Sequence, residues 1–132
     1  MFKAKEIMTK NVISVKSNML VSQAMTLLVN NHISGLPVVD DELNLVGMVS
    51  EKDFLILLAH KRFNKKDVVG QFMTKQVVSF KEDDLVWDIC EFFMKASMRR
   101  VPITKDGKLV GILSRRDIIK TILKVRGKSQ MH

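Results

Sequence analysis

The sequence has one cysteine, Cys90, in 132 residues. A single cysteine excludes an intrachain disulfide and any metal site built mainly from cysteine. The three histidines, His32, His60 and His132, show no ligand spacing of the H-x-x-x-H kind, so we expect no metal site. The longest unbroken apolar run is Phe54–Ala59, which is far short of the roughly 18 residues that a membrane span requires.

Catalytic motifs are also missing. The sequence contains no G-x-S-x-G, H-E-x-x-H, Walker loop or G-x-G-x-x-G. Its acidic clusters, Asp40–Glu42 and Glu82–Asp84, fall at an expected turn and at an expected helix start, where turn and capping chemistry account for them. The N-terminal MFKAKEIMTK has no apolar segment or small-residue cleavage site of an export signal. The sequence therefore predicts a cytoplasmic protein that is not an enzyme.

Basic residues outnumber acidic ones, 22 to 14, giving a net charge of +8, and this excess favours polyanionic ligands. Arg116, Lys120 and Lys124 recur every fourth residue beside an apolar face, as on a helix that could track phosphates. Any core-packed helix with a solvated face shows the same pattern, and no nucleic-acid-binding signature accompanies it. Nucleic-acid binding is therefore a weaker alternative.

The most informative feature is an internal repeat. At an offset of 65, Ile7–Val15 aligns with Phe72–Phe80. After a shorter second turn the offset becomes 64, and "GMVSEKD" at Gly47–Asp53 aligns with "GILSRRD" at Gly111–Asp117. The predicted organisation is a first repeat at 3–62, a linker at 63–71, a second repeat at 72–126 and a basic C-terminal tail at 127–132.

Each repeat reads as β-α-β-β-α, a mixed α/β (α+β) fold class. Short alternating runs predict strands, and apolar residues at helical spacing predict the first helix, with Ser17–Asn18 or Asp83–Asp84 as capping residues. Two further strands follow, and Pro37 and Pro102 are expected to open the first of them. Because a unit of about 60 residues buries too little by itself, we expect the two to pack sheet to sheet into one module.

The repeated Ser-x-x-Asp, Ser50 to Asp53 and Ser114 to Asp117, has two interpretations. It predicts a capping box at a helix start. The glycine three residues before each serine indicates in addition a close backbone approach or a ligand. A helix N-terminus suits phosphate, and an aspartate there can accept both hydroxyls of a ribose. Helix cap and nucleotide cradle both remain open.

Taken together, I/F-M-T-x-x-V-x-S, S-G-L-P-V-V or R-R-V-P-I, and G-h-h-S-x-x-D, each occurring in both copies, closely resemble a pair of cystathionine β-synthase (CBS) domains over residues 3 to 125. The resemblance implies two related clefts between the repeats, a homodimer, and an adenosine-containing ligand such as AMP, ADP, ATP or S-adenosylmethionine. It also implies regulation of another protein. The predicted function is a stand-alone regulatory module with an unidentified separate partner, no required cofactor and no membrane; the alternative is a ligand-free structural dimerisation module.

The resemblance also implies site residues, with each cleft taking its aspartate from one copy and its base contacts, largely through the backbone, from the other. One cleft would hold Asp117, Ser114, Thr9, Ser14, Ile33, Ser34 and Gly35. The other would hold Asp53, Ser50, Lys52, Thr74, Ser79, Met98 and Arg99. Arg115, Arg116, Arg99 and Arg100 supply positive charge suited to phosphate, whereas the first copy has Glu51–Lys52 between its serine and aspartate. We expect the Asp117 cleft to prefer a charged nucleotide.

Overall fold

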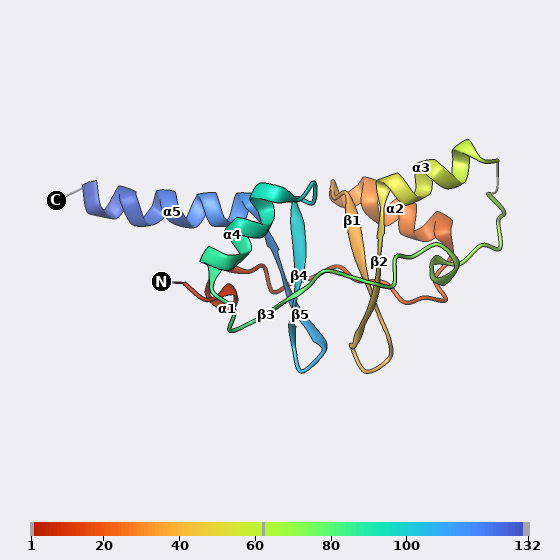
Figure 1. Cartoon of the computed structure of the whole chain (residues 1–132). Coiled ribbons are helices and arrows are strands. Elements are labelled where there is room, and N and C mark those ends of the chain that lie inside the picture. The colour runs from red at the N-terminus through yellow and green to blue at the C-terminus, as the bar shows by residue number, and fades with distance from the viewer. Residues whose placement is uncertain (1, 62, 131–132) are drawn as a thin grey trace. The chain divides into compact units, whose positions relative to one another are not determined.

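The structure, a computed structural model, describes residues 2–61 and 63–130 (Figure 1). It divides into two compact units. We call Ile13–Val77 the middle unit, and the residues up to Val12 together with those from Val78 onward the terminal unit. The Met-Thr segment of each repeat therefore lies in the unit formed by the other repeat's strands and helices. Residue 62, the predicted end of the first repeat, and residues 131–132 of the predicted tail lie outside the described residues.

The middle unit contains a two-stranded antiparallel sheet and its covering helices. Its elements are α2 (Val21–Asn31), β1 (Gly35–Val39), β2 (Leu45–Ser50), α3 (Glu51–Ala59) and the 3-10 turn η1 (Val69–Gln71). Helix α2 contacts β1 and α3, and α3 contacts β2. The apolar side chains buried among these elements are Val15, Val21, Ala24, Leu28, Leu36, Val38, Val49, Phe54, Leu57 and Val69.

The terminal unit repeats this plan with one more strand. Its elements are α1 (Ala4–Ile7), β3 (Phe80–Lys81), α4 (Val86–Lys95), β4 (Arg100–Lys105), β5 (Lys108–Ser114) and α5 (Arg115–Gln130). Strand β3 is parallel to β4, and β4 and β5 form an antiparallel hairpin beside which α4 and α5 pack (Figure 1). The buried apolar residues are Ala4, Val86, Ile89, Phe93, Val101, Ile103, Leu113 and Ile118. The predicted mixed α/β class is confirmed.

The first predicted strand of each repeat is shorter than expected. In the middle unit it is a single parallel bridge: the Val15 N–H donates to the Pro37 carbonyl at 3.0 Å, and the Val39 N–H donates to the Val15 carbonyl at 2.8 Å. In the terminal unit only Phe80–Lys81 pair with β4. The chain crosses from one unit to the other at Val12 and again after Val77, so few residues remain to run beside the hairpin.

The prediction that the prolines open their strands was wrong, because Pro37 and Pro102 are the third residues of β1 and β4. Pro37 faces Met48, whose N–H and carbonyl are both bonded to Thr74 on the far side of β2. Pro102 likewise faces Ile112, which is bonded to Thr9. Each proline thus sits at a non-hydrogen-bonded position of its hairpin, where the missing N–H removes no bond between the two strands.

The predicted capping residues of α2 and α4 do not cap these helices. The N-cap positions are occupied by Leu20 and Leu85, without a side-chain cap bond. Asp84 instead accepts a hydrogen bond from the Lys81 N–H at 2.7 Å. Aspartate side chains commonly bond to backbone groups within a few residues along the chain, so this aspartate closes the turn before the helix.

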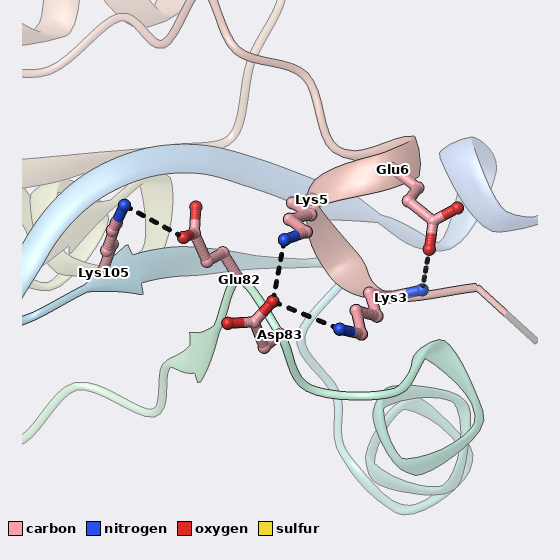
Figure 2. Close-up of polar contacts among 6 residues, drawn as sticks. All are labelled: Lys3, Lys5, Glu6, Glu82, Asp83 and Lys105. Atoms are coloured by element: carbon pink, nitrogen blue, oxygen red, sulfur yellow. Dashed lines mark hydrogen bonds and ion pairs between the residues drawn. The ribbon is translucent and has the colours of Figure 1, made fainter.

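The N-terminal segment is tied to the β3–α4 turn by backbone and ionic contacts. The Ala4 N–H donates to the Asp84 carbonyl and the Lys5 N–H to the Glu82 carbonyl, both at 2.9 Å. Figure 2 shows Asp83 between two lysines, with its Oδ1 3.0 Å from Lys5 Nζ and 3.6 Å from Lys3 Nζ. The Lys5–Asp83 hydrogen bond and charge attraction lower the pKa of Asp83 and raise that of Lys5.

Candidate functional site

Both Ser-x-x-Asp turns are capping boxes, as the first interpretation predicted. Where β2 ends, the Ser50 N–H donates to Asp53 Oδ2 at 2.8 Å, and the Asp53 N–H donates to Ser50 Oγ at 3.4 Å. Where β5 ends, the same two bonds join Ser114 and Asp117, each at 3.0 Å. Each aspartate uses Oδ2 for the cap, and among the described residues no hydrogen bond reaches either Oδ1.

The repeated glycines are explained by the chain itself. A Cβ at Gly47 would lie 2.7 Å from Met73 Sδ and 3.0 Å from the Thr74 carbonyl oxygen. A Cβ at Gly111 would collide with Met8 in the same way. The sequence left open whether each glycine accommodates a close backbone approach or a ligand, and the structure shows the close backbone approach. The glycines therefore carry no information about a ligand.

This close approach brings both predicted threonines to the strands that lead to the aspartates. Thr9 exchanges two backbone hydrogen bonds with Ile112, at 2.8 and 3.0 Å, in the unit that contains Asp117. Thr74 exchanges the equivalent bonds, at 2.8 and 2.9 Å, with Met48, in the unit that contains Asp53. Thr9 and Thr74 are both exposed.

The remaining predicted site residues are divided between the units. Ser14, Ile33, Ser34, Gly35 and Lys52 lie in the middle unit with Asp53. Ser79, Met98, Arg99, Arg100 and Arg116 lie in the terminal unit with Asp117. That each aspartate is joined by turn residues of the other repeat stays a prediction.

Each predicted base-contact turn is tied to the start of the helix in its own unit. The Glu51 N–H donates to the Ser34 carbonyl at 2.9 Å, and the Arg115 N–H donates to the Arg99 carbonyl at 3.0 Å. These bonds place the Ile33–Gly35 turn beside the Ser50 capping box and the Met98–Arg100 turn beside the Ser114 capping box.

Arg115 has contacts that the sequence did not reveal. Its Nη2 donates to the carbonyls of Phe93, at 3.1 Å, and Ala96, at 2.7 Å, at the end of α4. Its Cζ lies 5.7 Å from the centre of the Phe93 ring. All four arginines, Arg99, Arg100, Arg115 and Arg116, are exposed, but the Arg115 guanidinium is engaged in hydrogen bonds within the protein.

A small cavity of about 130 Å³ adjoins Asp53 and is lined also by Ile56, Leu57, His60 and Phe72. The spacing of its α3 residues, i, i+3, i+4 and i+7, marks one face of a helix and could have identified this group from the sequence. Ligand pockets for drug-sized molecules measure roughly 300–1,000 Å³, so this cavity alone does not enclose a nucleotide.

A second cavity, of about 150 Å³, is apolar and lies in the terminal unit. Cys90 lines it, and burial raises the pKa of this thiol. Across the residues that the structure describes, no group of three His, Cys, Asp or Glu side chains is arranged to hold a metal ion. None of the helices in the described residues has the length and apolar character to cross a membrane.

Comparison with protein families identifies both repeats. The family model described as CBS domain matches the chain twice, at residues 4–60 and 69–124. Among curated proteins, inosine-5'-monophosphate dehydrogenase of Methanocaldococcus jannaschii is 39% identical over 119 residues, which are 89% of this chain and 23% of that protein. The chloroplastic CBS domain-containing protein CBSX2 of Arabidopsis thaliana is 29% identical, over 92% of this chain and 63% of that protein. The chain thus spans less than two thirds of the length of both relatives.

Solved structures of CBS pairs match the fold closely. CBSX2 in complex with AMP gives a TM-score of 0.85 at 32% identity, covering 96% of this chain and 99% of that one. The CBS domain pair of protein MJ0100, in complex with 5'-methylthioadenosine and S-adenosyl-L-methionine, gives a TM-score of 0.79 at 28% identity, covering 92% of this chain and 96% of that one. Both relatives were therefore solved with adenosine compounds.

Proposed function

Because the chain belongs to the CBS domain family and contains a tandem pair of these domains, we propose that it is a regulatory module for an adenosine-containing ligand such as AMP, ADP or ATP. The observation that carries the proposal is the likeness to CBSX2, which is 32% identical over nearly the whole chain and was solved with AMP. The module is non-catalytic, cytoplasmic and homodimeric, and it signals to a separate partner protein.

The two capping boxes supply suitable chemistry. Asp53 and Asp117 are half-buried at helix N-termini and hold Oδ2 in the cap, which leaves Oδ1 to accept from ribose hydroxyls. The positive end of the helix dipole favours a phosphate. A ribose phosphate can therefore be recognised here without displacing the cap.

Of the two sites, that of Asp117 suits the more highly charged ligand. With Arg115 engaged at the end of α4, Arg116 is the cation available between the serine and the aspartate. In the first copy Lys52 is accompanied by Glu51, which cancels its charge. Guanidinium groups also bind phosphate with two parallel hydrogen bonds, which an ammonium group does not do.

Regulation would operate through differential binding. A ligand that binds one arrangement of repeats or subunits more tightly than another shifts the population toward that arrangement, and the same coupling free energy changes ligand affinity when the partner binds. No chemical step is required of any residue in this scheme.

The alternative is a structural dimerisation module without a ligand. The observation that favours it is that capping boxes and methionine packing account for the repeated serine, aspartate and glycine without a ligand. In the regulatory module the aspartate carboxylates bind a ligand as well as cap the helices, whereas in the structural module they only cap the helices.

Thermal unfolding with AMP, ADP, ATP and S-adenosylmethionine separates these functions. A ligand at about 100 times its dissociation constant stabilises the native state by roughly 2.7 kcal/mol. We expect Asp117→Asn to lose most of the ATP-induced shift, and Asp53→Asn less. Glu91→Gln is the control, because it removes an exposed carboxylate of the same unit outside the predicted site. Absence of a shift with every ligand would leave the structural module as the function.

A further inference from the structure

The two repeats end their first helix in different ways. Helix α2 ends at His32, which has a left-handed backbone, φ 52° and ψ 43°. The His32 N–H donates to the carbonyls of Leu28 and Val29, and the Ile33 N–H donates to the Leu28 carbonyl at 3.1 Å. A left-handed residue that returns amides to the last turn is a common C-cap, so α2 satisfies its own end.

Helix α4 has no such cap. Its C-cap residue, Ala96, is extended, with φ −99° and ψ 154°. Positive φ angles among the described residues occur at His32, Leu43, Lys61, Asp106 and Gly107, none of which lies in the turn from Ala96 to Arg100. The chain therefore leaves α4 along a different path from the one it takes out of α2.

Arg115 replaces the missing cap. Its guanidinium donates to the carbonyls of Phe93 and Ala96 and lies over the Phe93 ring, which is 7% exposed. A cation at a helix C-terminus is favourable, and hydrogen bonds from a charged donor are strong. The Arg115 N–H also donates to the Arg99 carbonyl. One residue thus holds both ends of the segment Ala96–Arg99.

We propose that Arg115 is a positioning residue that fixes the extended Ala96–Arg99 turn and thereby sets the base specificity of the nucleotide site that this turn borders. The proposal rests on the proposed function for its ligand. Base contacts in this turn are expected to come largely from backbone atoms, so the path of the backbone decides which hydrogen-bond donors and acceptors face the base. The backbone of the Ile33–Gly35 turn follows a different path, so the site that this turn borders recognises a base differently.

The counterpart of Arg115 in the first repeat confirms that the arrangement is specific to one copy. Glu51 makes the same backbone bond, to the Ser34 carbonyl at 2.9 Å. A carboxylate has no proton to donate to a helix-end carbonyl and is repelled by the negative end of the helix dipole. Helix α2, with its left-handed cap, needs no such donor.

The test compares Arg115→Met, Arg115→Lys and the matched control Lys120→Met, which removes a cation from the same helix at an exposed position. Two measurements are made under conditions in which every variant is folded. The first is hydrogen exchange at the amides of Ala96 and residue 115, which are bonded to Phe92 and Arg99. The second is the affinity for AMP and for GMP by calorimetry.

In Arg115→Met we expect about tenfold faster exchange at both amides, because the turn opens locally. We also expect about tenfold weaker AMP binding and a reduced preference for AMP over GMP, because the turn is no longer pre-organised. Arg115→Lys should recover part of both effects, and Lys120→Met should match the wild type. Wild-type AMP affinity and preference in Arg115→Met would overturn the positioning role. Absence of AMP binding by the wild type would instead refute the proposed function, while the exchange rates still test whether Arg115 holds the turn.

Discussion

Met8 lies against Gly111 so closely that a Cβ at residue 111 would be 2.8 Å from Met8 Cγ and 3.1 Å from the Thr9 carbonyl oxygen. Gly47 and Met73 have the same relationship in the other unit. The side chain of a methionine can move, but the carbonyl oxygen belongs to a paired backbone segment. The glycine and the Met-Thr segment therefore form one packing unit.

Gly111→Ala should lower the free energy of unfolding by about 1–3 kcal/mol, the usual cost of overpacking, and Gly47→Ala should do the same. Gly127→Ala is the control: it lies in α5 with nothing within 4 Å of the added Cβ, and replacing a helical glycine should stabilise by about 0.5–1 kcal/mol. Urea unfolding of the three variants measures this. Wild-type stability in Gly111→Ala would show that the Met8 contact is not maintained.

The two capping boxes should differ in strength. The Asp117 N–H to Ser114 Oγ bond is 3.0 Å, whereas the Asp53 N–H to Ser50 Oγ bond is 3.4 Å. Removing a serine N-cap costs about 1 kcal/mol, so Ser114→Ala should cost about this much and Ser50→Ala less. Denaturant unfolding at one pH compares them, and an equal or larger loss in Ser50→Ala would contradict the geometry.

Local features were the most predictable from the sequence. A capping box joins residues three positions apart, so Ser50 and Asp53 carry enough information by themselves. The repeat likewise revealed the family, because motifs recur in order. Contacts between distant segments were not predictable in this way. The exchange of the Met-Thr segments between units depends on where the chain crosses over, and nothing near Met8 or Met73 encodes that; the resemblance to a known family, not residue spacing, predicted Thr9 with Asp117 and Thr74 with Asp53.

Arg115 illustrates the same limit at the candidate site. In the sequence it looks equivalent to Arg116, and both were predicted to bind phosphate. Its partners Phe93 and Ala96 lie 22 and 19 residues earlier, and they need a donor because α4 ends without a left-handed residue. That backbone conformation is a property of the folded turn. The sequence shows that residue 115 is an arginine, but it does not show that this side chain contacts the end of α4.

The Lys5–Asp83 pair should make stability depend on pH at both extremes. Because the pKa of Asp83 is lowered from 3.8, its contribution is complete above that value and is lost as the pH falls through the lowered pKa. Because the pKa of Lys5 is raised from 10.5, its contribution is complete below that value and is lost as the pH rises through the raised pKa. Both groups are exposed, so salt should weaken the effect.

Urea unfolding across the pH range measures the stability difference between the wild type and Asp83→Asn. This difference should shrink in strong acid and in strong base. It should also shrink in 1 M salt, where the Debye length is about 3 Å. Glu91→Gln, an exposed carboxylate on α4, is the control for a general loss of negative charge. A difference that stays constant with pH and salt would mean that the ion pair contributes nothing to the attachment of the N-terminal segment.

Cys90 should be a slow thiol in the native protein. It is partly buried beside the apolar cavity, and burial raises its pKa, which reduces the fraction present as the reactive thiolate. Labelling with a disulfide reagent at neutral pH should be at least about tenfold slower in the folded protein than in urea, because both access and thiolate fraction are reduced. Trp87 forms part of the cavity wall and is 61% exposed, so Trp87→Ala should open the cavity and speed labelling. Since the chain has one cysteine, the rate reports this site alone. Equal rates in the folded and unfolded protein would place the thiol in open solvent and contradict the packing of α4 against α5.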